Sequence, residues 1–248
     1  MHNETPKTVY LSAIAEVELK DYLCGRGFKI SEFGPIEGLS EGIACHPDLV
    51  FCRLFYGDTT AFESTSPLQS SSDCFVSAMG LSGPGLFCGD ESHLKPQYPG
   101  DVLYNACSTG KYFLHNLKYT APELLEAARS AGLELIDIPQ GYAKCSIAVV
   151  SETAIITYDR GIAATIKAAG GILDVLLIEP GHIELPGYST GFIGGCTGLD
   201  YIHNELIING DLSLHPDGDR IREFVESHGV TVRDFPGRPL TDIGSIIF

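Results

Sequence analysis

Four segments of the chain repeat one pattern. A glycine ends a helix-like stretch, a short apolar stretch follows, and a proline ends it, at residues 27–35, 132–139, 171–180 and 229–236. After each copy comes a run of small residues and then another apolar stretch; one such run is Gly194-Gly195-Cys196-Thr197. A supersecondary unit that recurs at this scale is typical of a modular fold, in which neighbouring units bury each other's apolar faces.

The spacing within each repeat predicts two strands, then a helix, then a third strand. The paired strands are expected at 101–105 and 111–115, at 146–150 and 154–158, and at 199–202 and 206–208. Helices are expected to open near Ser12, Thr120, Asp159 and the His215-Pro216-Asp217 run. Serine, threonine and aspartate are common helix N-caps, and proline is tolerated in the first turn of a helix.

The two ends of the chain complement each other. The first piece holds a strand at 9–11, a helix and a further strand, whereas 244–248 is a lone strand. We therefore predict an α/β fold of five strand–strand–helix–strand modules in a ring, closed where the two ends join, because closure removes exposed sheet edges. The modules are centred on 45–60, 101–116, 145–158, 196–208 and the joined ends. The prediction is a single domain over 1–248 with a Ser/Gly/Pro-rich loop insertion at about 63–98, including a weak helix at 75–79.

Composition narrows the functional classes. The formal net charge of −16 disfavours nucleic acid and anionic membranes as partners and is compatible with a small cationic ligand. The longest apolar runs are too short to span a bilayer, and the first residues lack the features of a signal peptide. The eight cysteines include no C-x-x-C pair, so we expect reduced thiols, a cytoplasmic location, no metal and no cofactor.

Two motifs add to the modular pattern: Pro99-Gly100-Asp101-Val102-Leu103-Tyr104 and Asp242-Ile243-Gly244-Ser245-Ile246-Ile247. Together with the modular repeat, these two motifs resemble the pentein, or guanidine-modifying enzyme, family. That family includes dimethylarginine dimethylaminohydrolase, arginine deiminase and agmatine deiminase, and its architecture is shared by eukaryotic translation initiation factor six. The first motif is similar to the family's Gly-Gly-Asp-Val-Leu-Phe strand, and the second lies where the hydrolases have Cys-Cys-Ser-Val-Leu. The resemblance implies an α/β propeller with a pseudo-fivefold axis.

The resemblance also implies a chemistry that this chain only partly supports. The enzymes use a cysteine thiolate, a histidine and carboxylates that hold the guanidinium. The cysteine position falls at Ile243 or Gly244, and the histidine position falls at Gln140. Only the anchoring carboxylate is present, at Asp101. We therefore do not expect the usual hydrolase or deiminase reaction.

Several further residues are candidates for a site. Asp58, Asp101, Asp211 and Asp242 fall near predicted strand ends and would form an anionic pocket if they converge, although aspartate is also common in caps and turns. His182 and Glu184 are two residues apart on an extended segment, so both can face the same way and transfer a proton, or simply belong to a polar loop. By contrast, His46 and His215 each precede Pro-Asp and are expected at surface turns.

Three cysteines occupy equivalent places in three modules: Cys107, Cys145 and Cys196. If they meet at the axis, they are either a relocated nucleophile or thiolate metal ligands, or they are small apolar side chains in a crowded centre. We favour packing, because a buried thiol away from positive charge stays protonated.

The sequence thus predicts a pentein-type protein that binds a small guanidinium or amine compound at a central mouth without hydrolysing it. The candidate ligand-binding residues are Asp101, Gln140, His182, Glu184, Asp58 and Asp242. One alternative is a non-enzymatic interaction protein that uses a face of the ring. Another is a hydrolase with rearranged catalytic residues. A deep pocket holding a thiol and a histidine favours the enzyme, and a filled mouth favours the interaction protein.

Overall fold

The described part of the chain forms five small sheets in the computed structural model, which describes residues 7–37, 39–54, 75–77, 86–88 and 94–248. Four sheets have three strands and the fifth has two. The strands are β1 (Thr8–Ser12), β2 (Lys29–Phe33), β3 (Phe51–Arg53), β4 (Phe75–Ser77), β5 (Leu86–Cys88), β6 (Cys107–Ser108), β7 (Tyr112–His115), β8 (Glu134–Asp137), β9 (Ile147–Ser151), β10 (Ala154–Thr157), β11 (Asp174–Leu177), β12 (Thr197–Asp200), β13 (Glu205–Ile208) and β14 (Thr231–Arg233).

Each three-stranded sheet has the same topology. Its second strand is central, antiparallel to the first and parallel to the third, as β10 is to β9 and β11. Parallel neighbours need a crossover connection, and a helix supplies it in three of these sheets. These helices are α2 (Pro122–Ser130), α4 (Arg160–Ala168) and α5 (Gly218–Ser227), and α1 (Val17–Gly25) connects β1 to β2. The predicted strand–strand–helix–strand order is therefore present in the sheets that contain β6, β9 and β12.

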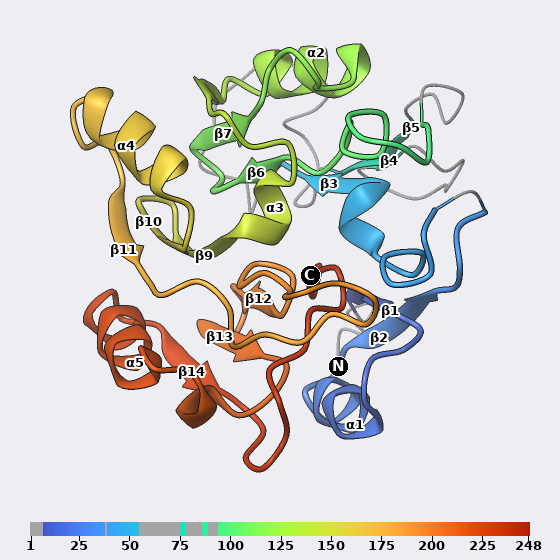
Figure 1. The fold of residues 1–248 in the computed structure, drawn as a ribbon, viewed down its shortest axis with the longest axis vertical. Coiled ribbons are helices and arrows are strands. Elements are labelled where there is room, and N and C mark those ends of the chain that lie inside the picture. The colour runs from blue at the N-terminus through green and yellow to red at the C-terminus, as the bar shows by residue number, and fades with distance from the viewer. Residues whose placement is uncertain (1–6, 38, 55–74, 78–85, 89–93) are drawn as a thin grey trace, which may run out of the picture.

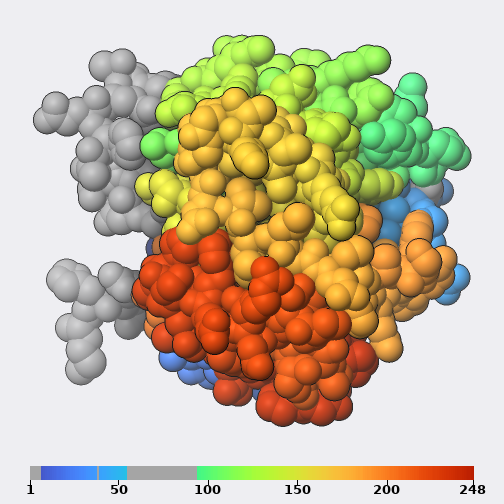
Figure 2. Space-filling model, turned by 60° about the vertical axis from the view of Figure 1, so that its left-hand side comes forward, coloured from blue at the N-terminus to red at the C-terminus, as the bar shows by residue number. Residues whose placement is uncertain are grey.

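The sheets are arranged around a common centre, with α1, α2, α4 and α5 at the periphery (Figure 1). Seen from the side, α4 and α5 form neighbouring parts of the outer surface (Figure 2). Apolar side chains fill the space between the helices and the sheets and between neighbouring sheets; α4, for example, buries Ile162 and Ile166. The described strands form separate open sheets and not one closed sheet.

The two ends of the described chain meet beside β1. The N–H of Tyr10 donates to the carbonyl of Ile247 (2.7 Å), and the N–H of Ile247 donates to the carbonyl of Tyr10 (3.1 Å). The pairing is an isolated antiparallel bridge, so residues 244–248 do not form a regular strand. The C-terminal end of the chain lies near the centre of the molecule (Figure 1).

Two of the four predicted helix starts agree with the structure, at Asp159 and at the His215-Pro216-Asp217 run, where Asp217 is the N-cap of α5; the other two differ. Asp159 caps α4, because its Oδ1 accepts hydrogen bonds from the N–H groups of Gly161 and Ile162. Ser12 instead ends β1, and α1 starts only at Val17. At α2 the N-cap is Ala121, so the cap predicted for Thr120 is wrong.

Two predicted elements have a different structure. Residues 101–105 form turns and not a strand, because the N–H of Val102 bonds to the carbonyl of Pro99 and that of Asn105 bonds to the carbonyl of Val102. The first strand of that sheet is β6. The predicted weak helix at 75–79 is wrong as well, since 75–77 form β4 between β3 and β5. Both β4 and β5 fall inside the range 63–98 that we expected to be a loop.

Among the described residues, no helix has the length and apolar character that crossing a membrane would require.

Candidate functional site

The small-residue runs that follow the repeats contact one another at the centre of the molecule. The N–H of Gly195 donates to the carbonyl of Cys145 (3.0 Å), and the N–H of Ser245 donates to the carbonyl of Gly195 (2.8 Å). The N–H of Asp48 in turn donates to the carbonyl of Gly244 (3.3 Å). The first two of these backbone bonds join residues 50 positions apart in sequence, and the third joins residues 196 positions apart.

Small residues are required where these runs cross. A Cβ atom on Gly194 would lie 2.1 Å from the carbonyl oxygen of Lys144, which no real side chain could occupy. Gly244 has a φ of 72°, and a Cβ there would lie 2.4 Å from the Cα of His46. The glycines thus bring the polar side chains of the neighbouring segments within contact distance.

A buried polar cluster lies at this crossing, and we call it the central cluster. Its members are His46, Asp48, Asn105, Cys145, Asp242 and Ser245, all buried. His46 and Asp48 flank Pro47 at the start of the 3₁₀ helix η1 (Pro47–Leu49), and Cys145 lies on the short helix α3 (Ala143–Ser146).

Asp48 is the hub of the central cluster. Its Oδ2 accepts a hydrogen bond from the Sγ–H of Cys145 (3.1 Å) and another from the hydroxyl of Ser245 (2.7 Å). Asn105 contacts the same thiol, with its Nδ2 3.2 Å from Sγ. Lys144 reaches the cluster from one side, where its Nζ donates to the Ser245 hydroxyl (3.0 Å).

Asp242 and His46 form the other half of the central cluster. Asp242 accepts hydrogen bonds from the N–H groups of Phe192 and Gly244 (each 3.0 Å), and its Oδ1 lies 3.9 Å from Nδ1 of His46. Burial raises the pKa of Asp242, an effect that His46 opposes and Asp48 reinforces. The two carboxylates therefore share one desolvated region.

The three aligned cysteines have different surroundings. Cys107 and Cys196 pack among apolar side chains, and burial raises the pKa of both thiols, that of Cys107 to about 12. Cys145 contacts polar groups, yet burial and the nearby charges of Asp48 and Asp242 raise its pKa well above the ordinary value. All three are thus thiols at neutral pH, and only Cys145 belongs to the central cluster.

Asp101 lies outside the central cluster, on the turn that replaces the predicted strand. Its Oδ2 accepts a hydrogen bond from the hydroxyl of Tyr142 (2.5 Å), whose pKa is raised by burial and by this carboxylate. Among the described residues, no group donates to Oδ1 of Asp101, although the side chain is buried. This carboxylate borders a cavity of about 60 Å³ lined by Ile36, Glu37, Leu39, Leu49, Val50, Leu94, Lys95 and Pro96.

Both polar atoms of the Gln140 side chain form hydrogen bonds within the protein. Its Nε2 donates to Oδ2 of Asp159 (2.9 Å), and its Oε1 accepts from the N–H of Tyr142 (3.0 Å). Gln140 therefore connects the cap of α4 to the segment that leads into α3.

His182 and Glu184 lie outside the central cluster, in a pocket that contains neither Asp48 nor Asp242. Both line an open pocket of about 650 Å³ together with Tyr188, Thr190, Leu214 and Thr241. The His182 side chain is 40% exposed, and its Nε2 lies 3.5 Å from Oε1 of Glu179. Asp211 caps the 3₁₀ helix η5 (Leu212–Leu214), and hydrogen bonds led by the one from the Gly237 N–H lower its pKa. Asp58 falls outside the described residues.

The predicted site residues thus occupy separate places: Asp242 and Cys145 belong to the central cluster, whereas the sequence interpretation did not place His46 and Asp48 there. We expected His46 and His215 at surface turns, but both are buried, at 1% and 3% exposure. For His46 the reason is that the Pro-Asp turn follows Ala44-Cys45, the small-residue run of its own module, and that run lies at the centre. The position of this run was the signal that could have placed His46 and Asp48 correctly.

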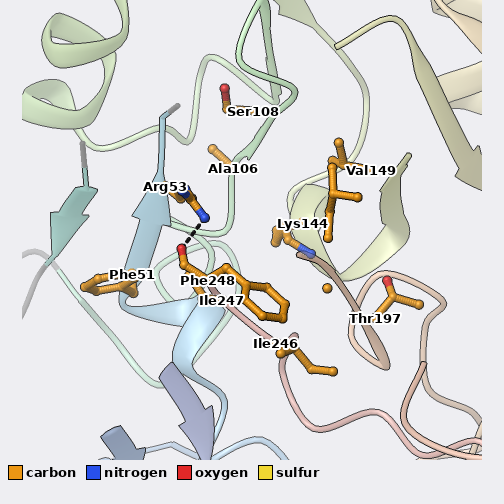
Figure 3. Close-up of a pocket in the computed structure, with 12 residues that line it drawn as sticks. Phe51, Arg53, Ala106, Ser108, Lys144, Val149, Thr197, Ile246, Ile247 and Phe248 are labelled. Carbon is orange, nitrogen blue, oxygen red and sulfur yellow. Dashed lines mark hydrogen bonds between the residues drawn. The ribbon is translucent and has the colours of Figure 1, made fainter. Parts of the chain in front are cut away.

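A second small cavity lies beside the central cluster. It measures about 20 Å³ and is lined by side chains that include Arg53, Lys144, Thr197 and Phe248. Figure 3 shows Phe248 between Arg53 and Lys144, with Arg53 bonded to the carbonyl oxygen of Phe248. The end of the described chain therefore fills most of this part of the centre.

A family model described as "Family of unknown function (DUF6873)" matches residues 11–247. The chain belongs to this family. No curated protein matches it by sequence. Among solved structures, the chain is similar to dimethylarginine dimethylaminohydrolase as an adduct with 4-chloro-2-hydroxymethylpyridine, with a TM-score of 0.50, 9% identity, and coverage of 93% of this chain and 92% of the other. At that identity the likeness concerns the fold, which is mixed α/β and similar to that of a pentein.

Proposed function

We propose that this chain is a cytoplasmic α/β propeller of five strand–strand–helix–strand modules that binds a small amine or guanidinium compound at Asp101 and does not hydrolyse it. The fold likeness to an enzyme named for dimethylarginine supports this class of ligand. The observation that carries the proposal is the unpartnered, buried oxygen of Asp101 beside a cavity.

The carboxylate of Asp101 is suited to a cation. Leaving a buried charged acceptor without a donor costs more than the 1–3 kcal/mol that is typical of a neutral group, so a ligand N–H at Oδ1 would stabilise the site. Tyr142 occupies only the other oxygen. Besides Asp101 the cavity lining includes one acid, Glu37, and one base, Lys95, which leaves a net negative charge.

The size of the cavity limits the ligand. A volume of about 60 Å³ corresponds to a few water molecules. This space accommodates an ammonium or guanidinium group but not a whole amino acid, so the remainder of a longer ligand would extend beyond it.

Hydrolysis is not expected at this position. The residues that line the cavity supply neither a thiol nor an imidazole. At the two positions implied by the family resemblance, Ile243 is a buried apolar side chain and Gln140 is engaged by Asp159. A guanidinium held by Asp101 therefore has no nucleophile beside it among the described residues.

The test is calorimetric titration with methylguanidine, methylamine and agmatine on the wild type and on Asp101→Asn. We expect the variant to lose about 10- to 100-fold in affinity, the value of one charge-assisted hydrogen bond. Asp21→Asn, an exposed change on α1, is the charge-matched control and should bind as the wild type does. Equal affinity of Asp101→Asn and wild type, or no binding of any probe to the wild type, would overturn the proposal.

A second candidate is the hydrolase with rearranged residues, favoured by the closeness of Cys145, His46 and Asp48, whose ligand atoms lie within 4.8 Å of one another. Its weakness is that Cys145 is a buried thiol beside two carboxylates, the opposite of an activating environment. Formation of citrulline or ornithine from an arginine derivative that disappears in Cys145→Ser would establish it.

A third candidate is the non-enzymatic interaction protein that uses a face of the ring, and a different observation favours it. Residues 243–248 are buried and fill the centre, leaving about 20 Å³ there. This candidate predicts that none of the three titrated compounds binds.

A further inference from the structure

Three side chains of the central cluster have the chemistry of metal ligands. His46, Asp48 and Cys145 offer nitrogen, oxygen and sulfur atoms that lie within 4.8 Å of one another. The exposed fractions of the three residues are only 1%, 0% and 3%. Two of them come from the segment that precedes β3, and the third comes from α3, which precedes β9.

Two polar atoms of this group are left without partners. Among the described residues, neither Nε2 of His46 nor Oδ1 of Asp48 has a hydrogen-bond partner, and both atoms are inaccessible to solvent. Buried polar groups are nearly always satisfied, so an unpaired imidazole nitrogen and an unpaired carboxylate oxygen in one cluster point to a bound species as their partner.

The charge around these atoms favours a cation as that species. Asp48 and Asp242 are both buried; the carboxylate of Asp242 lies 3.9 Å from His46, and that of Asp48 accepts a hydrogen bond from Cys145. The Nζ of Lys144 contacts the cluster through the hydroxyl of Ser245 (3.0 Å) and also donates to the carbonyl of Gly194 (3.3 Å). A divalent cation together with Lys144 would balance the two carboxylates and the thiolate that metal binding produces, whereas a water molecule would satisfy the orphaned atoms without balancing the charge.

The donor set identifies the class of metal. One thiolate, one imidazole and one carboxylate are the ligands of zinc, whereas calcium and magnesium prefer sites made only of oxygen. Asp242 would act as a positioning residue, because its Oδ1 is 3.9 Å from Nδ1 of His46 and carboxylates commonly orient histidine ligands.

We propose that His46, Asp48 and Cys145 bind one zinc ion that links the segments preceding β3 and β9 at the centre of the molecule. On binding, the Sγ–H proton of Cys145 passes to solvent, and the thiolate forms the bond to the metal. The site is independent of ligand binding at Asp101, since none of the three residues lines that cavity.

The test uses the full chain, expressed in medium supplemented with zinc or with cobalt and purified without chelator. We expect about one metal ion per chain by elemental mass spectrometry. The cobalt form should have the near-ultraviolet charge-transfer band of a thiolate bound to cobalt. Cys145→Ser should lose this band and lower the metal content at least tenfold, whereas Cys107→Ser, a buried thiol outside the cluster, should keep both.

His46→Gln gives a second measurement should Cys145→Ser fail to fold, and it should also lower the metal content at least tenfold. Asp101→Asn should retain the full metal content, which separates this proposal from the proposed function. A wild type that carries less than a tenth of an equivalent of either metal, or a thiolate band that survives in Cys145→Ser, would overturn the proposal.

Discussion

At the scale of single residues, the burial of His115 makes the unfolding free energy depend on pH. Its ring is buried, with Nε2 donating to the carbonyl of Gly141 (2.8 Å) and Nδ1 lying 2.8 Å from the Thr120 hydroxyl. Burial lowers the pKa of His115 to about 4, against about 6.5 for the unfolded chain. Between these values the unfolded state binds more protons, so the stability that His115 contributes is complete above pH 6.5 and is lost as the pH falls toward 4. The total loss is about 3 kcal/mol.

Urea unfolding at pH 7 and pH 5 measures this effect. Over that range we expect the wild type to lose about 2 kcal/mol more unfolding free energy than His115→Gln, which lacks the titrating ring. An equal loss in the two proteins would show that His115 is not the source of the pH dependence.

At the scale of elements, the cap of α4 depends on two residues. Oδ1 of Asp159 accepts from the helix N–H groups, and Oδ2 accepts from Gln140. Asp159→Ala should lower the unfolding free energy by about 1–2 kcal/mol, and Gln140→Ala by about 1 kcal/mol. Because Gln140 supports the cap and not the ligand, Gln140→Ala should leave amine binding unchanged in the titration that tests Asp101. If Gln140→Ala binds the amine more weakly but unfolds at the same free energy as the wild type, Gln140 is a ligand-binding residue and does not support the cap.

The same elements show how far the sequence could predict the structure. The positions of glycine and proline and the Asp159 cap are local signals. From them, the bounds of β10 and β13 and the start of α4 were predicted to within one residue. The turn at 101–105 was mistaken for a strand, because Val102 and Tyr104 alternate as in a strand but are both buried within a turn. The contacts of Asp48 in the central cluster could not be predicted, because they join residues 97 positions apart (Cys145) and 197 positions apart (Ser245), and no local pattern records such a contact.

At the scale of the whole molecule, the bridge between Tyr10 and Ile247 joins the backbones of the two ends of the described chain. Ile247→Pro removes the N–H that donates to the carbonyl of Tyr10 and leaves that carbonyl without its donor. We expect a loss of about 3 kcal/mol or more, against about 1 kcal/mol for the control Ile247→Val, which only removes a buried methylene. If the bridge holds the sheets together as one cooperative unit, far-ultraviolet circular dichroism and tyrosine fluorescence should report the same, lower midpoint in Ile247→Pro. A separate early transition in one signal would mean that the sheet containing β1 unfolds alone and that the ends do not join the modules into a single unit.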